Sequence, residues 1–168
     1  MHVILYMATS VNGYIAKLDH DTPWSEEEFD SFASKVKEVG NLIIGKTTFD
    51  LIHDEDGFDG LDNPFVVCLT SSNEKPPRKN TVFVKDFTEA IEKLAKEGFD
   101  TALVTGGGQT DTAALESGLI KEIYLDIEPH IFGQGIPLFS PSEVDLELKF
   151  IEARPIGKSG VQLHYTVN

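Results

Sequence analysis

Three consecutive glycines stand between an apolar segment and a helix-like segment, in the stretch Ala102-Leu103-Val104-Thr105-Gly106-Gly107-Gly108-Gln109-Thr110. Leu and Val ahead of a turn are typical of a buried strand. Glycines at the end of that strand let the backbone approach a ligand closely, because no Cβ intervenes. A helix over residues 109–117 would direct its free N–H groups at the same place, as phosphate sites require. The pattern therefore predicts either a phosphate-binding turn or a plain strand-to-helix turn.

Two other segments place small hydroxyl residues at strand ends. Gly45-Lys46-Thr47-Thr48 lies where a strand meets a short helix, and Thr70-Ser71-Ser72 follows the next strand. Lys46 offers a positive charge, and the threonines offer hydroxyl groups beside free backbone N–H groups. One such end is commonplace, because Ser and Thr are ordinary helix caps. Three together predict a groove for an extended cofactor that carries phosphates.

Two segments resemble known phosphate-binding motifs in sequence, but neither meets the full requirements of its motif. Residues 40–47 have the G-x-x-x-x-G-K-T spacing of a P-loop, but the residues between the two glycines form the expected strand itself, and a helix precedes them. The run from Gly106 begins a G-x-G-x-x-G pattern, but Asp111 stands at the position of the last glycine. We therefore expect neither a P-loop NTPase nor a Rossmann domain.

The chemistry-bearing segments alternate with elements that can position them. Strands are expected at residues 3–9, 42–45, 65–69, 81–84 and 101–105, and helices at 26–39, 87–97 and 109–117, with a short helix after Lys46. Only strands are expected later, at 122–128, 145–154 and 161–167. This order implies a single α/β domain over residues 1–168, with a mostly parallel sheet and antiparallel strands at the end. Ligand sites in such sheets lie at the carboxyl ends of the strands.

Composition limits the possible partners. The net charge of −14 over 168 residues argues against nucleic acid or an anionic membrane surface as a partner. No segment is long and apolar enough to cross a membrane, and the first residues lack the basic flank of a signal peptide. With a single cysteine, Cys68, we expect a cytoplasmic protein. The five histidines have no ligand spacing, so we expect no metal site.

An ordered set of motifs resembles the dihydrofolate reductase-like superfamily, and most closely its riboflavin-biosynthesis branch, the reductase domain of the bifunctional deaminase-reductase. In chain order these motifs are Ala8-Thr9-Ser10-Val11-Asn12-Gly13-Tyr14-Ile15-Ala16, Pro23-Trp24, Gly45-Lys46-Thr47-Thr48, Thr105-Gly106-Gly107-Gly108 and Pro129-His130-Ile131-Phe132-Gly133-Gln134-Gly135. The resemblance covers nearly the whole chain. It implies a three-layer α/β/α fold and an NADPH-dependent reductase of a small heterocycle or sugar, often a homodimer. Dihydrofolate reductase proper and a non-catalytic nucleotide-binding module are the alternatives.

The resemblance also assigns the cofactor contacts. Ala8 and Ile15 would hold the nicotinamide carboxamide through their backbones. Gly106 and Gly107 match the family's Gly-Gly pair against the cofactor. The remaining expected contacts, from the adenosine side to the pyrophosphate, are Gly45, Lys46, Thr47, Thr48, Thr70, Ser71, Thr105, Gly108, Gln109 and Thr110. Lys46 stands where the family usually has Arg, and a lysine lacks the fork that grips a 2′-phosphate, so the preference for NADPH over NADH stays open.

On the substrate side, the resemblance points to two carboxylates. Glu28 aligns with the residue that grips the pterin ring in dihydrofolate reductases, but Ser25-Glu26-Glu27-Glu28 also spells a helix capping box in which Glu28 would reach back to Ser25. Asp126 stands where folate enzymes carry a Thr, and it could bind substrate hydroxyls, supply a proton or face solvent. Two nearby carboxylates would raise each other's pKa, so that one could act as the acid.

Two further residues are candidates for substrate contact. Trp24 either covers the substrate site or only fixes its loop to the core. Asn12 stands in Ser10-Val11-Asn12-Gly13, where the riboflavin branch typically has Ser-x-Asp-Gly, and Lys121-Glu122 replaces the Asp-Glu of that branch. These two departures argue against a phosphorylated ribosylaminopyrimidine substrate. The sequence therefore predicts the class of reaction and leaves the substrate open.

Overall fold

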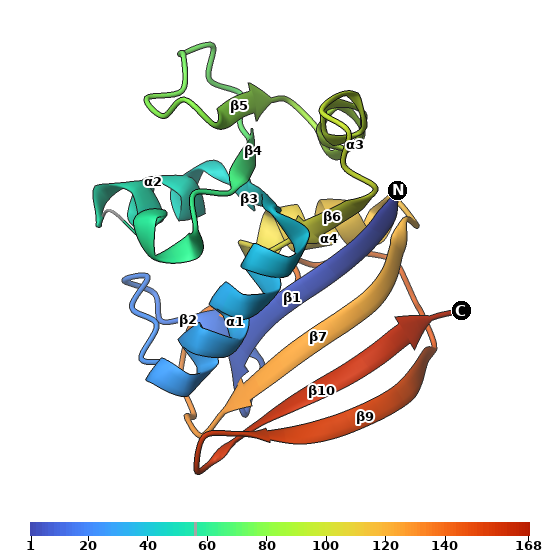
Figure 1. Ribbon diagram of the computed structural model, residues 1–168. Helices are drawn as coiled ribbons and strands as arrows, with labels where there is room; N and C mark the ends of the chain where they lie inside the picture. The colour runs from blue at the N-terminus through green and yellow to red at the C-terminus, as the bar shows by residue number, and fades with distance from the viewer. Residues whose placement is uncertain (56) are drawn as a thin grey trace.

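The computed structural model describes residues 1–55 and 57–168 of the chain. Within these residues eight strands form one sheet, in the order β5-β4-β3-β6-β1-β7-β10-β9, while β2 and β8 pair separately (Figure 1). The elements are β1 His2–Ser10, β2 Tyr14–Ala16, α1 Glu26–Val39, β3 Asn41–Gly45, α2 Lys46–Asp54, a 3-10 helix Asp59–Leu61, β4 Phe65–Leu69, β5 Thr81–Val84, α3 Phe87–Lys96, β6 Thr101–Val104, α4 Gly108–Glu116, β7 Ile120–Glu128, β8 Ile136–Pro137, β9 Leu148–Ile156 and β10 Gly160–Val167.

The sheet is parallel over its first six strands and antiparallel at one edge. β1 lies between β6 and β7 and runs parallel to both, with Leu5 opposite Val104 and Ala8 opposite Asp126. β10 runs antiparallel to β7, and β9 runs antiparallel to β10. The predicted arrangement of a mostly parallel sheet with antiparallel C-terminal strands is therefore confirmed.

Helices cover both faces of the sheet, which gives the predicted three layers. Figure 1 shows α1 in front of the sheet and α4 behind it. On the α1 and α2 side, Val36 and Phe49 pack against sheet residues such as Ile44. On the other side, the α3 and α4 residues Leu94 and Ala114 pack in a second core. Each strand of the centre is thus apolar on both faces, as parallel strands require.

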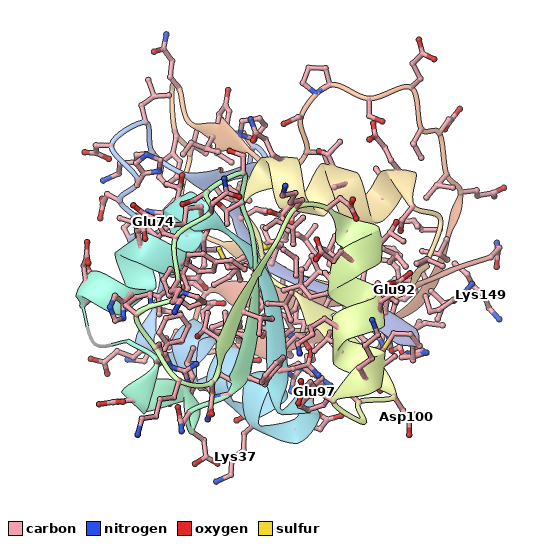
Figure 2. The ribbon with its side chains drawn as sticks, turned by 90° about the horizontal axis from the view of Figure 1, so that it is seen from above. Lys37, Glu74, Glu92, Glu97, Asp100 and Lys149 are labelled. Carbon is pink, nitrogen blue, oxygen red and sulfur yellow. The ribbon has the colours of Figure 1, made fainter. Side chains whose placement is uncertain are left out.

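Charged side chains line the outside of these layers. Figure 2 labels exposed charged residues at the periphery of the molecule, among them Glu74 after β4, Glu92 in α3, Glu97 at its end and Lys149 in β9. In the part of the chain that the structure describes, no helix is both long and apolar enough to span a membrane.

The structure differs from the sequence prediction at short or exposed strands. β9 begins at Leu148 and ends at Ile156, so the prediction of a strand over residues 145–154 was wrong at both ends. β2 and β8, of three and two residues, were not predicted, because so short a segment shows no periodicity. The second difference matters for the site, since Pro137 of β8 packs against Gly108 of the glycine turn.

Candidate cofactor and substrate groove

A groove of about 860 Å³ opens at the carboxyl ends of the parallel strands. β1, β3, β4 and β6 end at this edge because they run parallel, and the segments that follow them form the walls. All the residues predicted for cofactor binding line it: Ala8, Ile15, Gly45, Lys46, Thr47, Thr48, Thr70, Ser71, Thr105, Gly106, Gly107, Gly108, Gln109 and Thr110. Trp24 and Glu28 line the same groove, whereas Asn12 and Asp126 are not among its lining residues.

The glycine turn joins the end of β6 to the start of α4. The N–H group of Gly45 donates to the carbonyl of Gly106 at 2.9 Å, which ties the ends of β3 and β6 together. Gly106 has a φ of 100°, a left-handed conformation that favours glycine. The carbonyl of Gly107 accepts from the N–H groups of Thr110 and Asp111 and so opens the first turn of α4. The earlier N–H groups of α4 have no partner within the helix and are free for an anion in the groove.

The three glycines differ in what a side chain would meet. A Cβ on Gly108 would lie 2.6 Å from the carbonyl oxygen of Pro137 in β8, so the backbones touch there. A Cβ on Gly107 would lie 3.5 Å from Thr48 Oγ1 and 3.9 Å from Ile15 Cδ1, which is ordinary contact between residues that line the groove. Gly107 therefore leaves open a space that belongs to the groove itself.

One carboxyl group lies buried beneath this turn. Asp111, in the first turn of α4, is fully buried, and among the described residues neither of its carboxyl oxygens has a hydrogen-bond partner. Burial raises the pKa of Asp111 well above its ordinary range, and the nearby Gly106 backbone offsets this only in part. A protonated Asp111 adds no negative charge next to the free N–H groups of α4.

Lysine and hydroxyl side chains form one end of the groove. Lys46 Nζ donates to both carboxylate oxygens of Asp50, at 2.6 and 2.7 Å, and this hydrogen bonding raises the pKa of Lys46. Thr70 and Ser71 follow β4, and Lys85 follows β5 at the same edge. A phosphate-bearing group would find two cations here, one of them already paired with a carboxylate.

Aromatic residues and a glutamate form the other end. Tyr6, Trp24, Phe29 and Phe32 line the groove around Glu28. Trp24 stacks on Phe132 with ring centroids 5.8 Å apart, so this residue both lines the groove and fixes its loop. Such a surface suits a flat, uncharged ring system.

Glu28 lines the groove, and a different glutamate completes the cap of α1. The N–H of Glu28 donates to Ser25 Oγ at 3.2 Å, as a capping box requires. The N–H of Ser25, however, donates to Glu128 at 2.8 Å and not to Glu28. The predicted return contact from the Glu28 side chain to Ser25 was therefore wrong. Burial, with Asp126 and Glu128 nearby, raises the pKa of Glu28 to about 8.

Asp126 is buried behind the groove in a hydrogen-bond network. Tyr6 Oη donates to Asp126 Oδ2 at 2.6 Å, and Gln162 Nε2 donates to Asp126 Oδ1 at 2.7 Å. Arg154 Nε in turn donates to Gln162 Oε1 at 2.7 Å. Burial raises the pKa of Asp126, and the hydrogen bonds from Tyr6 and Gln162 oppose that rise. The sequence left open whether Asp126 faces solvent, and its burial excludes this. Asp126 does not line the groove itself, but its hydrogen-bond partner Tyr6 does.

Asn12 fastens a loop beside the groove. Its Nδ2 donates to the carbonyl of Phe132 at 2.7 Å, and its Oδ1 accepts from the N–H of Phe132 at 3.2 Å. The side chain of Ser10 also donates to Asn12 Oδ1, at 2.9 Å. Asn12 thus holds the loop on which Trp24 stacks.

Comparison with known proteins identifies the family of the chain. The family model of the RibD C-terminal domain matches residues 1–162. The chain belongs to the RibD C-terminal domain family. It is 25% identical over 167 residues to the uncharacterized protein YwjB of Bacillus subtilis, covering 96% of this chain and 95% of that one.

Solved structures agree in fold with this RibD C-terminal domain. A candidate riboflavin biosynthesis protein from Shewanella sp. PV-4 superposes with a TM-score of 0.79 at 24% identity, covering 100% of this chain and 99% of that one. The deaminase and 5-amino-6-(5-phosphoribosylamino)uracil reductase of Thermotoga maritima superposes with a TM-score of 0.76 at 18% identity. This domain covers 99% of its own length and 56% of the Thermotoga chain. At these identities the likeness shows the fold.

Several groove residues of this RibD C-terminal domain were not predicted. Lys85 follows a strand at the same edge as Thr70, so the rule applied to the other strand ends would have found it. Tyr6 was assigned to the first strand but not to the site. Apolar residues fill that strand on both faces, so the sequence does not reveal which side chains meet the groove. Pro137 comes from β8, whose position depends on tertiary contacts. Among the described residues, no group of three or more His, Cys, Asp or Glu could hold a metal ion.

Proposed function

We propose that this RibD C-terminal domain is an NADPH-dependent reductase that delivers a hydride to a C=N or C=O group of a small heterocycle or sugar. The observation that carries the proposal is the single groove in which a glycine turn, a helix N-terminus and two lysines meet an aromatic end with a buried glutamate. The glycine turn, helix N-terminus and lysines suit a dinucleotide, and the aromatic end suits the ring that the dinucleotide would reduce.

The groove fits an extended dinucleotide at several points. The missing side chain of Gly107 and the free N–H groups at the start of α4 would receive the pyrophosphate. Lys46, Thr70 and Ser71 would receive the adenosine side. Ala8 and Ile15, which also line the groove, would hold the nicotinamide carboxamide through their backbones.

Bound NADPH would supply the hydride, and the side chains of the groove would bind, orient and protonate. Reduction of C=N or C=O also consumes a proton. Glu28 is buried with a pKa of about 8, so at neutral pH its carboxyl carries a proton at the aromatic end of the groove. Asp126 would act on the same end through its hydrogen bond with Tyr6 Oη.

The substrate end favours a ring over a phosphate. The lysines that line the groove, Lys46 and Lys85, both belong to the end assigned to the cofactor. The reaction class of 5-amino-6-(5-phosphoribosylamino)uracil reductase is therefore proposed without its phosphorylated substrate. Glu28, with its carboxyl free of the helix cap, also favours a second candidate, dihydrofolate reductase proper, in which this carboxyl would bind the pterin ring.

The test is consumption of NADPH by the purified protein with each candidate substrate in turn. Turnover with dihydrofolate or with the pyrimidine riboflavin precursor supports the corresponding reductase. Binding of NADPH with no turnover on any C=N or C=O substrate supports instead a nucleotide-binding module without catalysis. No binding of NADPH or NADH would overturn the proposal.

We propose further that the domain forms a homodimer through β9. β9 is the outermost strand of the sheet, and every residue from Leu148 to Pro155 is exposed. Phe150 and Ile151 are apolar side chains exposed there by 56% and 43%. An exposed edge strand with apolar side chains is a surface for pairing with another strand, here the β9 of a second copy.

A further inference from the structure

Two glutamates compete for the same donors at the start of α1. Ser25 is the N-cap of α1, and its sequence spacing to Glu28 is that of a capping box. In such a box, the side chain three residues into the helix accepts from the N–H of the cap residue. Here Glu128, at the end of β7, occupies that place, with Oε2 accepting from the Ser25 N–H at 2.8 Å and Oε1 accepting from Ser25 Oγ at 3.2 Å.

The competition decides where the Glu28 carboxyl lies. A backbone N–H has a single proton, so the bond to Glu128 leaves Ser25 with no N–H for Glu28. Among the hydrogen bonds of the described residues, none involves the Glu28 side chain, which lines the groove and is only 6% exposed. Among the described residues, the fully buried side-chain oxygens without a partner do not include those of Glu28, so its carboxyl is open to the groove. A carboxyl in this position gains a hydrogen bond if a backbone N–H becomes available to it.

Glu128 is itself held firmly in place. It is 1% exposed, and its carbonyl accepts from the N–H of His130 at 2.7 Å. On the neighbouring strand, a Cβ on Gly160 would lie 2.7 Å from Glu128 Oε1, so the glycine leaves the room that this carboxyl occupies. The strand, the turn after it and Gly160 together direct Glu128 at the α1 cap.

We propose that Glu128 is a positioning residue for Glu28: by accepting both hydrogen bonds of the Ser25 cap, it keeps the Glu28 carboxyl turned into the groove. The part of this inference that concerns catalysis rests on the proposed function, in which Glu28 protonates the substrate. The part that concerns position stands on the cap geometry alone. Asp126, Glu128 and the Tyr6 hydroxyl are the titratable groups that act on or lie beside Glu28 in this region.

The test compares Glu128→Gln with Glu128→Met. Both variants remove the negative charge and keep a side chain of similar length, but only Gln retains an oxygen that accepts from the Ser25 N–H. The readout is the pKa of Glu28, followed by carboxyl ¹³C NMR and assigned with Glu28→Gln. This titration needs neither substrate nor cofactor.

We expect Glu28 in Glu128→Gln to titrate near its wild-type midpoint, apart from the effect of the lost charge. In Glu128→Met the Glu28 carboxyl should turn back to Ser25 and the α1 N-terminus, and its midpoint should lie about one further pH unit or more below that of Glu128→Gln. Equal midpoints in the two variants would overturn the proposal, since Glu128 would then act through its charge alone.

Two further measurements keep the test decisive. If Glu128→Met does not fold, Glu128→Ala gives the same comparison with Gln, because Ala also lacks the acceptor. NADPH binding should be the same in wild type and Glu128→Gln. Failure of the wild type to bind NADPH would count against the proposed function, while the NMR titration would still decide the role of Glu128.

Discussion

Gly107 is the residue at which an added methyl group would fill the groove without disturbing the fold. Its φ is −77°, which any residue adopts, and its Cβ would meet Thr48 and Ile15 only at ordinary contact distance. We therefore expect Gly107→Ala to weaken NADPH binding about tenfold, the effect of about 1.4 kcal/mol, because the methyl group stands where the cofactor would lie.

The measurement is a binding titration together with thermal unfolding. Gly133→Ala is the matched control, because a Cβ on Gly133 would meet nothing within 4 Å and Gly133 is not among the groove residues. Equal affinity of Gly107→Ala and wild type would show that the cofactor does not pass over the glycine turn.

Asp50 is expected to set the choice between NADPH and NADH. Its carboxylate holds Lys46 Nζ through two hydrogen bonds of 2.6 and 2.7 Å, so it offsets the charge of a lysine proposed for the adenosine side. Asp50→Asn would free that charge for a 2′-phosphate, and we expect NADPH affinity to rise about threefold to tenfold relative to NADH affinity. The two dissociation constants, measured for each protein, give this ratio.

A control for Asp50→Asn is available on α3. Lys93 and Glu97 form another ion pair four residues apart, at 2.8 Å, away from the groove residues. Glu97→Gln removes the same charge and should leave the NADPH to NADH ratio unchanged. A ratio that responds equally to both variants would mean that net charge, and not the Asp50 contact, is at work.

Helix α4 contains a buried carboxyl group, that of Asp111, whose raised pKa the sequence did not predict. Asp111 lies in its first turn, fully buried, and burial raises its pKa. The folded state therefore holds a proton that the unfolded state releases above about pH 4, and the free energy of unfolding falls as pH rises through that window. Asp111→Asn has no such proton to lose.

We expect Asp111→Asn to gain stability relative to wild type as pH rises from about 4 toward the folded-state pKa of Asp111. Denaturant unfolding of both proteins at a series of pH values measures the difference. Glu28 titrates in both proteins, so its contribution cancels. Parallel stability curves would contradict the assigned burial of an unpaired carboxyl.

The sequence predicted those helices and strands that have a clear pattern of apolar residues and glycines of their own. The strand before Gly106 and the helix after it were predicted from apolar runs and glycines, and both lie within one residue of their predicted bounds. β8 has two residues and is defined by its pairing with β2, which no local pattern encodes. The start of β9 was misplaced because an exposed edge strand shows little apolar alternation.

Part of the candidate site could likewise be predicted from sequence, and part could not. The cofactor end could be predicted because each segment carries its own glycine or hydroxyl signal at a strand end. The orientation of Glu28 could not, because Glu128, which takes over its capping partner, lies 103 residues away from Ser25. The Ser25 half of the capping box is present, because the Glu28 N–H donates to Ser25 Oγ, while Glu128 takes the place predicted for the Glu28 side chain.

We expect the whole molecule to be a homodimer whose interface depends on β9. Phe150→Asp places a charge on the exposed face of this edge strand and should yield a monomer in sedimentation velocity, because a buried unpaired charge opposes pairing. Leu18→Asp is the control, since Leu18 is 63% exposed in a loop far from β9 in sequence. A monomeric wild type would contradict the proposed assembly.

The groove is proposed to hold a reduced nicotinamide dinucleotide against its aromatic end. Trp24 is the only tryptophan in the chain and lines that groove, so its fluorescence reports on the site directly. Titration with NADPH should quench Trp24 emission saturably, with energy transfer to the nicotinamide and one cofactor bound per chain. Absence of saturable energy transfer with both NADPH and NADH would show that the groove does not bind a reduced nicotinamide dinucleotide.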